Sequence, residues 1–102
     1  MPIPSADNVW ERYVGESRFV TVNMVNDLDD GQTISTVADP TVESAAATYV
    51  TDSKAISSNG LMFSAKFTSV TAGHVKITFT VTAQNPTETL YAVAYLNQTS
   101  PT

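Results

Sequence analysis

The chain of 102 residues has a size that fits one domain. Its formal net charge of -5 argues against nucleic acid as a partner. Its lack of cysteine excludes disulfides and thiolate metal sites. The composition is 42% hydrophobic and 15% charged and is rich in Val, Thr and aromatic residues. It predicts an all-β protein, because such side chains suit a pleated sheet.

Residues 1–16 are predicted to form an N-terminal arm. Pro2 and Pro4 have no amide proton and hold the backbone extended. The remainder leaves two alternatives open: a short helix capped by Ser5 and ended by Gly15, or a fully extended segment. Both alternatives place the arm ahead of the first clear strand.

Trp10 and Tyr13 are the large aromatic side chains of this arm. One interpretation is that they fold back and cover an open end of the core. The other is that they dock on another chain, because Trp and Tyr are frequent anchors of protein interfaces. We therefore carry both residues forward as candidate partner-binding residues.

The start of the chain also bears on localisation. Pro2, Pro4 and Asp7 stand where a signal peptide would have its basic start and apolar run. No apolar run approaches the roughly 18 residues that a membrane span needs. We expect a protein made and kept soluble in a cytoplasm, without a membrane partner.

The first half of the chain reads as short strands between turns. Residues 18–25 alternate, with Val20, Val22 and Met24 on one side. An Asp-rich turn at 26–31 follows, and then a short strand at 32–37 that carries Ile34 inward. A strand or bend is expected around Val42, and residues 45–50 fit a strand better than a helical turn.

The clearest pattern lies between Gly60 and Ala83, where two alternating runs are joined by a short loop containing Gly73. Asn59-Gly60 is a strong turn signal ahead of the first run. Successive side chains of a strand face opposite sides of a sheet, so the pattern predicts a hairpin with one apolar and one polar face. The predicted inward row is Leu61, Phe63, Ala65, Phe67, Val75, Ile77, Phe79 and Val81.

The last predicted strand, residues 87–96, is apolar on both faces. Tyr91, Val93 and Tyr95 alternate with Leu90, Ala92, Ala94 and Leu96. A strand that is apolar on two sides is either central to a core or pressed against a partner. Tyr91, Val93 and Tyr95 are therefore further candidate partner-binding residues.

About seven short strands without a long helix predict a single immunoglobulin-like β-sandwich. The expected organisation is an arm at 1–16, the sandwich at 17–97 and a polar tail at 98–102.

Catalytic and metal-binding chemistry finds little support in the sequence. His74 is the single histidine, and no nucleophile elbow accompanies it. The carboxylates of the turn at 26–31 suit calcium, but their spacing does not fit an EF-hand, because Leu28 stands at a ligand position. We expect no enzyme activity, no cofactor and no metal, with a cation at this turn left as an open alternative.

Two segments resemble a known family. Gly31-Gln32-Thr33-Ile34-Ser35-Thr36 and the run from Thr71 to Thr82 are similar to the most recognisable parts of small immunoglobulin-like virion proteins of tailed bacteriophages. In that family a Gly-acidic-Thr-Ile turn follows the first strand, and a Thr-Ala-Gly loop opens a long alternating strand. The resemblance spans roughly residues 18–96. This chain departs by carrying Gln32 in the acidic position, and His74-Val75 where polar and Tyr residues are common.

The resemblance implies a virion structural protein made in the host cytoplasm. Its implied role is a capsid decoration, or cement, protein that binds the major capsid protein on the outer shell as a homo-oligomer in multiple copies. Two alternatives remain: a neck, tail or fibre accessory protein of the virion, and a carbohydrate-binding adhesion module.

Overall fold

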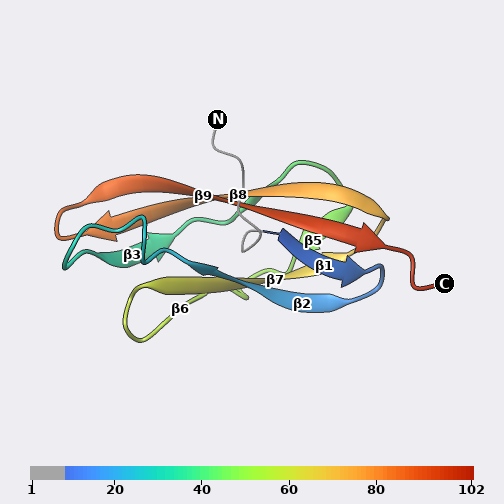
Figure 1. Ribbon diagram of the computed structural model, residues 1–102, viewed down its shortest axis with the longest axis horizontal. Coiled ribbons are helices and arrows are strands. Elements are labelled where there is room, and N and C mark those ends of the chain that lie inside the picture. The colour runs from blue at the N-terminus through green and yellow to red at the C-terminus, as the bar shows by residue number, and fades with distance from the viewer. Residues whose placement is uncertain (1–8) are drawn as a thin grey trace.

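The computed structural model describes residues 9–102, which form strands and loops and no helix. The strands pack as two sheets, so the prediction of an all-β sandwich is confirmed (Figure 1). The strands are β1 (Val9–Tyr13), β2 (Ser17–Asn23), β3 (Thr33–Val37), β4 (Thr41–Val42), β5 (Ala47–Tyr49), β6 (Ala55–Ile56), β7 (Met62–Ser69), β8 (Gly73–Gln84) and β9 (Glu88–Thr99).

The first sheet has five strands in the order β1-β9-β8-β3, and β4 also pairs with β8. β8 and β9 are antiparallel and paired from Gly73↔Gln98 to Ala83↔Glu88, and in Figure 1 they run side by side along the molecule in orange and red. β1 joins the free edge of β9 in parallel. The long β8–β9 pair is therefore the frame of this sheet.

The second sheet has four strands. β7 lies at its centre, with β2 on one side and β5 and β6 on the other. The order β2-β7-β5 in this sheet and β9-β8-β3 in the other is the B-E-D and G-F-C order of the immunoglobulin fold. The immunoglobulin-like architecture therefore follows from strand order without the cysteine pair of antibody domains.

The core lies between the two sheets and is built from the side chains that point inward, which are every second residue along each strand. Phe63 and Phe67 from β7 meet Phe79 from β8 edge to face, with ring centroids 4.9 and 6.1 Å apart. The other buried apolar side chains are Val20, Val22, Met24, Ile34, Val37, Ala47, Ala65, Val75, Ile77, Val81, Ala83, Ala92, Ala94 and Leu96.

The prediction that the two strands between Gly60 and Ala83 pair as a hairpin is wrong. The prediction of which side chains of these strands point inward is correct for all but one residue. β7 pairs with β2, β5 and β6, whereas β8 pairs with β9, β3 and β4. Residues 70–72 therefore carry the chain from one sheet to the other. Of the predicted inward row, only Leu61, ahead of β7, is half-buried; the others are buried. Alternation reports which face is buried and does not report which strand is the partner.

The ends of the sandwich differ from the predicted organisation. Residues 9–13 of the expected arm are strand β1 and are extended, and residues 14–16 turn the chain into β2. Residues 1–8, including Pro2, Pro4 and Ser5, lie outside the described residues. At the other end, β9 continues to Thr99, and Gln98 of the expected tail is buried. The sandwich thus begins earlier and ends later than predicted.

Candidate partner-binding face

The outward side chains of β1 and β9 form what we name the aromatic face: Val9, Tyr13, Tyr91, Val93 and Tyr95. The parallel register pairs Val9 with Tyr95 and Tyr13 with Thr99, and the burial of Ala92, Ala94 and Leu96 fixes the odd-numbered residues of β9 outward. Four of the five predicted partner-binding residues therefore share one side of the five-stranded sheet.

Exposure varies along this face. Tyr91 is 70% exposed, Tyr13 55% and Val9 40%, whereas Val93 and Tyr95 are half-buried between neighbouring strands. Across the sheet, Thr80 is paired with Tyr91 and Thr78 with Val93. Lys76 is paired with Tyr95, and Glu11 lies between Val9 and Tyr13 on β1. The part of the face around Tyr91 and Val93 is thus uncharged and held on paired strands, whereas charged side chains lie beside Tyr95 and Tyr13.

Trp10, the fifth predicted partner-binding residue, does not join this face. It is paired with Leu96, which points inward, and it is half-buried against the core. Its side chain therefore covers part of the core, as one of the two interpretations of the sequence predicted, whereas Tyr13 points outward. Val9 belongs to the face and was missed, because residues 1–16 carried no signal for pairing with a strand 86 residues further along the chain.

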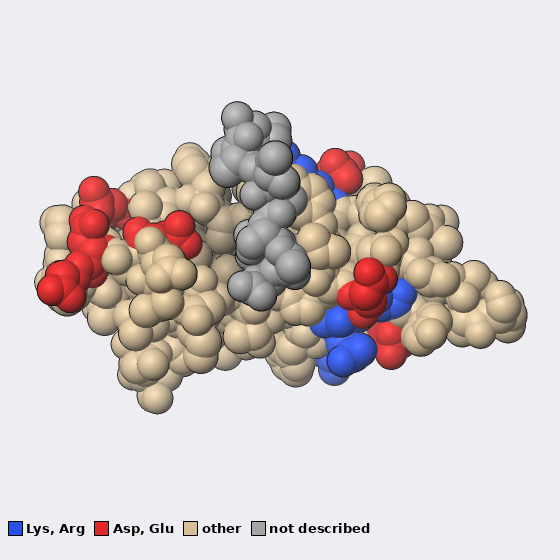
Figure 2. Space-filling view, viewed as in Figure 1, with Lys and Arg blue, Asp and Glu red and all other residues tan. Residues whose placement is uncertain are grey.

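The acidic turn is organised by a buried glutamine. Gln32 is 2% exposed; its Oε1 accepts a hydrogen bond from the amide of Asp29 at 2.9 Å. Its Nε2 donates to the carbonyl of Pro86 at 2.9 Å and to Oε1 of Glu88 at 2.8 Å. Gln32 therefore fastens the turn at 26–31 to the β8–β9 turn, and Figure 2 shows Asp and Glu side chains gathered at that end of the molecule.

No group of three or more His, Asp or Glu side chains in the described part of the chain is arranged to hold a metal ion. This includes the turn at 26–31, where a cation was the open alternative. His74 is exposed at the start of β8, opposite Asn97.

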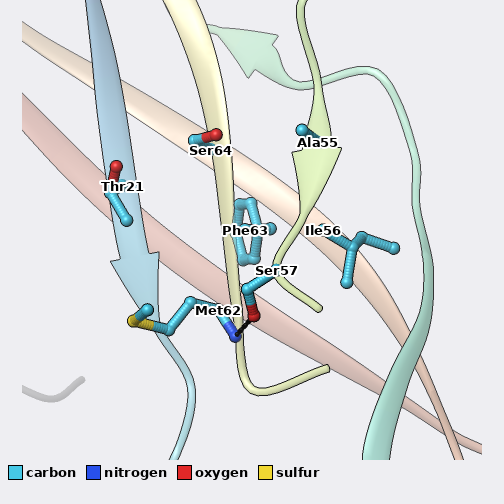
Figure 3. A pocket seen from close by; sticks show the side chains of 7 residues that line it. All are labelled: Thr21, Ala55, Ile56, Ser57, Met62, Phe63 and Ser64. Atoms are coloured by element: carbon cyan, nitrogen blue, oxygen red, sulfur yellow. Dashed lines mark hydrogen bonds between the residues drawn. The ribbon is translucent and has the colours of Figure 1, made fainter. Parts of the chain in front are cut away.

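A shallow pocket lies over β7, between Thr21 of β2 and Ile56 of β6 (Figure 3). Its volume is about 120 Å³, well below the roughly 300 to 1,000 Å³ of typical small-molecule sites. The remaining lining residues are Ala55, Ser57, Met62, Phe63 and Ser64. This pocket is too small for a drug-sized ligand. Two open hollows of about 360 and 300 Å³, one beside Arg12 and one between Ser35 and Ile56, reach only the lower end of that range. We therefore carry the aromatic face forward as the candidate for partner recognition.

Residues 9–102 include no helix of sufficient length and apolar character to cross a membrane.

Neither a protein-family model nor a curated protein matches the sequence. Among solved structures, the solution structure of amebosin is similar at a TM-score of 0.42 and 17% identity, over 92% of this chain and 93% of that chain. A similarity at this level supports no conclusion about function.

Proposed function

We propose that this chain is a bacteriophage virion structural protein of the decoration, or cement, type. It binds the major capsid protein on the outer shell in multiple copies and has no catalytic activity. The observation that carries the proposal is the aromatic face on an immunoglobulin-like sandwich, together with the similarity of the segments 31–36 and 71–82 to virion proteins of this kind.

The physical basis is linkage. A protein that binds the assembled shell and not the separate coat subunits stabilises the shell in proportion to the logarithm of its free concentration over its dissociation constant. Such binding favours a flat, preformed surface, because ordering a mobile segment would cost free energy on association. Tyr91, which is 70% exposed on a strand paired along its length, supplies an amphipathic anchor at little entropic cost.

The same surface fits a neck, tail or fibre accessory protein, so location on the particle is what an experiment must decide. Shells of the phage that encodes the chain are prepared without it, the purified protein is added, and bound copies are located by cryo-EM. We expect regular occupancy over the whole shell and a higher melting temperature of the decorated shell. Density at one vertex alone would replace this proposal with the neck or tail alternative, and no bound density would reject both.

The adhesion alternative predicts a different result. A carbohydrate-binding platform needs exposed aromatic rings. The single Trp of the chain, Trp10, faces the core, so Tyr13 and Tyr91 of the aromatic face would have to supply such a platform. Binding of the wild-type protein to a glycan array, with no binding to shells, would support that alternative.

A further inference from the structure

Strand β2 is an edge of the four-stranded sheet, paired with β7 on one side only. An edge strand exposes a row of backbone N–H and C=O groups that can pair with a strand of another chain. The register of the β2–β7 pair shows which residues of β2 carry these outward groups.

The residues of β2 whose backbone groups form hydrogen bonds with β7 are the even-numbered ones. The amide of Met24 donates to the carbonyl of Leu61 at 2.9 Å, and the amide of Ser69 donates to the carbonyl of Glu16 at 2.9 Å. Because bonded and outward residues alternate along an antiparallel pair, the backbone groups of Phe19 and Thr21 face away from β7. Within residues 9–102, no other strand pairs with this side of β2.

Arg12 lies across this edge. It stands on β1 opposite the buried Gln98, so its side chain leaves the first sheet on the inner side and reaches the second. Its Nη2 donates to the carbonyl of Phe19 at 3.0 Å, while its Nη1 donates to the carbonyl of Glu11 at 2.7 Å. The guanidinium thus occupies the carbonyl of Phe19, an outward hydrogen-bond acceptor of β2, and places a positive charge at this edge of the sheet.

Both positive and negative side chains surround Arg12. A groove of about 360 Å³ beside it is lined by Glu11, Tyr13, Glu16, Arg18 and Thr99. Burial and the nearby Arg18 lower the pKa of Arg12, while Glu16 acts in the opposite direction. Glu16 stands 3.8 Å from the guanidinium of Arg18 and accepts a hydrogen bond from the amide of Tyr13 at 2.6 Å. Within residues 9–102, Arg12 has no carboxylate partner closer than 4.0 Å.

We infer that Arg12 guards the open edge of β2 and prevents a second copy of this chain from adding its own β2 there. Two β2 strands related by a two-fold axis would pair in the antiparallel sense, which makes the edge self-complementary. In such a pair the Arg12 guanidinium of each copy would meet the incoming backbone at the carbonyl of Phe19. The inference is independent of the proposed function, because it concerns an edge outside the aromatic face.

The test compares Arg12→Met with Arg18→Met by sedimentation equilibrium, using the full chain. Methionine keeps an apolar stem and removes the donors. We expect the apparent mass of Arg12→Met to rise from the wild-type value toward twice that value as the protein concentration increases. We expect Arg18→Met to sediment as wild type, because the Arg18 side chain donates to no outward carbonyl of β2. Adding Thr21→Pro to Arg12→Met removes an outward N–H that β7 does not use, and the mass returns to the wild-type value.

Two results overturn the inference: a folded Arg12→Met that sediments as wild type, or an association that Thr21→Pro does not reverse. If Arg12→Met does not fold, hydrogen exchange on the dilute wild-type protein tests the premise that this edge of β2 is open. We expect the amides of Phe19 and Thr21 to exchange much faster than those of Val20 and Val22. Equal protection of all four amides would mean that the edge is not open.

Discussion

The ring of Phe63 on β7 meets the ring of Phe79 on β8 with centroids 4.9 Å apart and an interplanar angle of 67°. Two strands that follow each other in sequence therefore face one another across the sandwich and share no ladder. Both rings are almost fully buried. This contact makes the centre of the core sensitive to the loss of either ring.

Replacing Phe79 by alanine is expected to destabilise the protein by about 3 to 5 kcal/mol, because it removes a buried ring and leaves a cavity that the two sheets cannot close. Tyr91→Ala is the control, since Tyr91 is 70% exposed and its loss should change stability by no more than about 0.5 kcal/mol. Urea unfolding of both variants measures the difference. Equal losses in the two variants would contradict the assignment of inward and outward faces.

Gln32 provides a pH-dependent prediction. In Gln32→Glu a carboxylate replaces the amide that lies 2.8 Å from Oε1 of Glu88, and two carboxylates so close cannot both ionise without cost. The pKa of the pair is therefore raised in the folded variant. Since an acid with a raised folded-state pKa loses stability as the pH rises through that pKa, the variant should be less stable than wild type by about 1 to 3 kcal/mol at neutral pH.

The deficit of Gln32→Glu should shrink as the pH falls toward about 4, the ordinary range of carboxyl groups, where the pair holds a proton in both states. Gln32→Leu is the control, because, like Gln32→Glu, it removes the hydrogen bonds donated to Pro86 and Glu88, and it adds no charge. It also removes the acceptor of the Asp29 amide, which a carboxylate at position 32 keeps. Its deficit relative to wild type should be similar at both pH values. A deficit of Gln32→Glu that does not change with pH would contradict the prediction.

Gly60 and Gly31 allow a matched comparison of two turns. Both have positive φ, +73° and +80°, so alanine at either site costs about 1 to 2 kcal/mol of backbone strain. A Cβ at Gly60 would also lie 2.8 Å from Cβ of Thr33, whereas a Cβ at Gly31 meets nothing within 4 Å. Gly60→Ala should therefore lower the midpoint of thermal unfolding clearly more than Gly31→Ala, and equal midpoints would contradict the close packing of this turn on β3.

Strand faces could be predicted from the sequence, whereas strand partners could not. Val22, Phe67 and Ile77 alternate with polar neighbours and are buried as expected. The loop at 70–72 is short enough for a hairpin and also for a crossing between sheets, so its length does not distinguish the two. The pairing of β1 with β9 depends on contacts far apart in sequence, which leave no local pattern.

The candidate site was partly predictable for the same reason. Tyr91, Val93 and Tyr95 share a face because they are two residues apart on a strand. Trp10 and Tyr13 are three residues apart, a spacing that places them together on a helix and on opposite sides of a strand. Gln32 was predicted only as the first residue of the strand at 32–37, and its role in fastening the turn was missed. Its burial depends on Pro86 and Glu88, which lie more than 50 residues later.

The most direct test of the proposed function compares Tyr91→Ser with Phe19→Ser in binding to assembled shells. Phe19 is also an exposed aromatic residue, 52% exposed on the other sheet, so it controls for a general loss of apolar surface. We expect Phe19→Ser to decorate shells as wild type does. Because alanine-type truncation of an interface anchor typically costs about 2 kcal/mol or more, Tyr91→Ser should reduce cryo-EM occupancy strongly at the same concentration. Full occupancy by Tyr91→Ser, or an equal loss in both variants, would contradict the assignment of the aromatic face as the shell-binding surface.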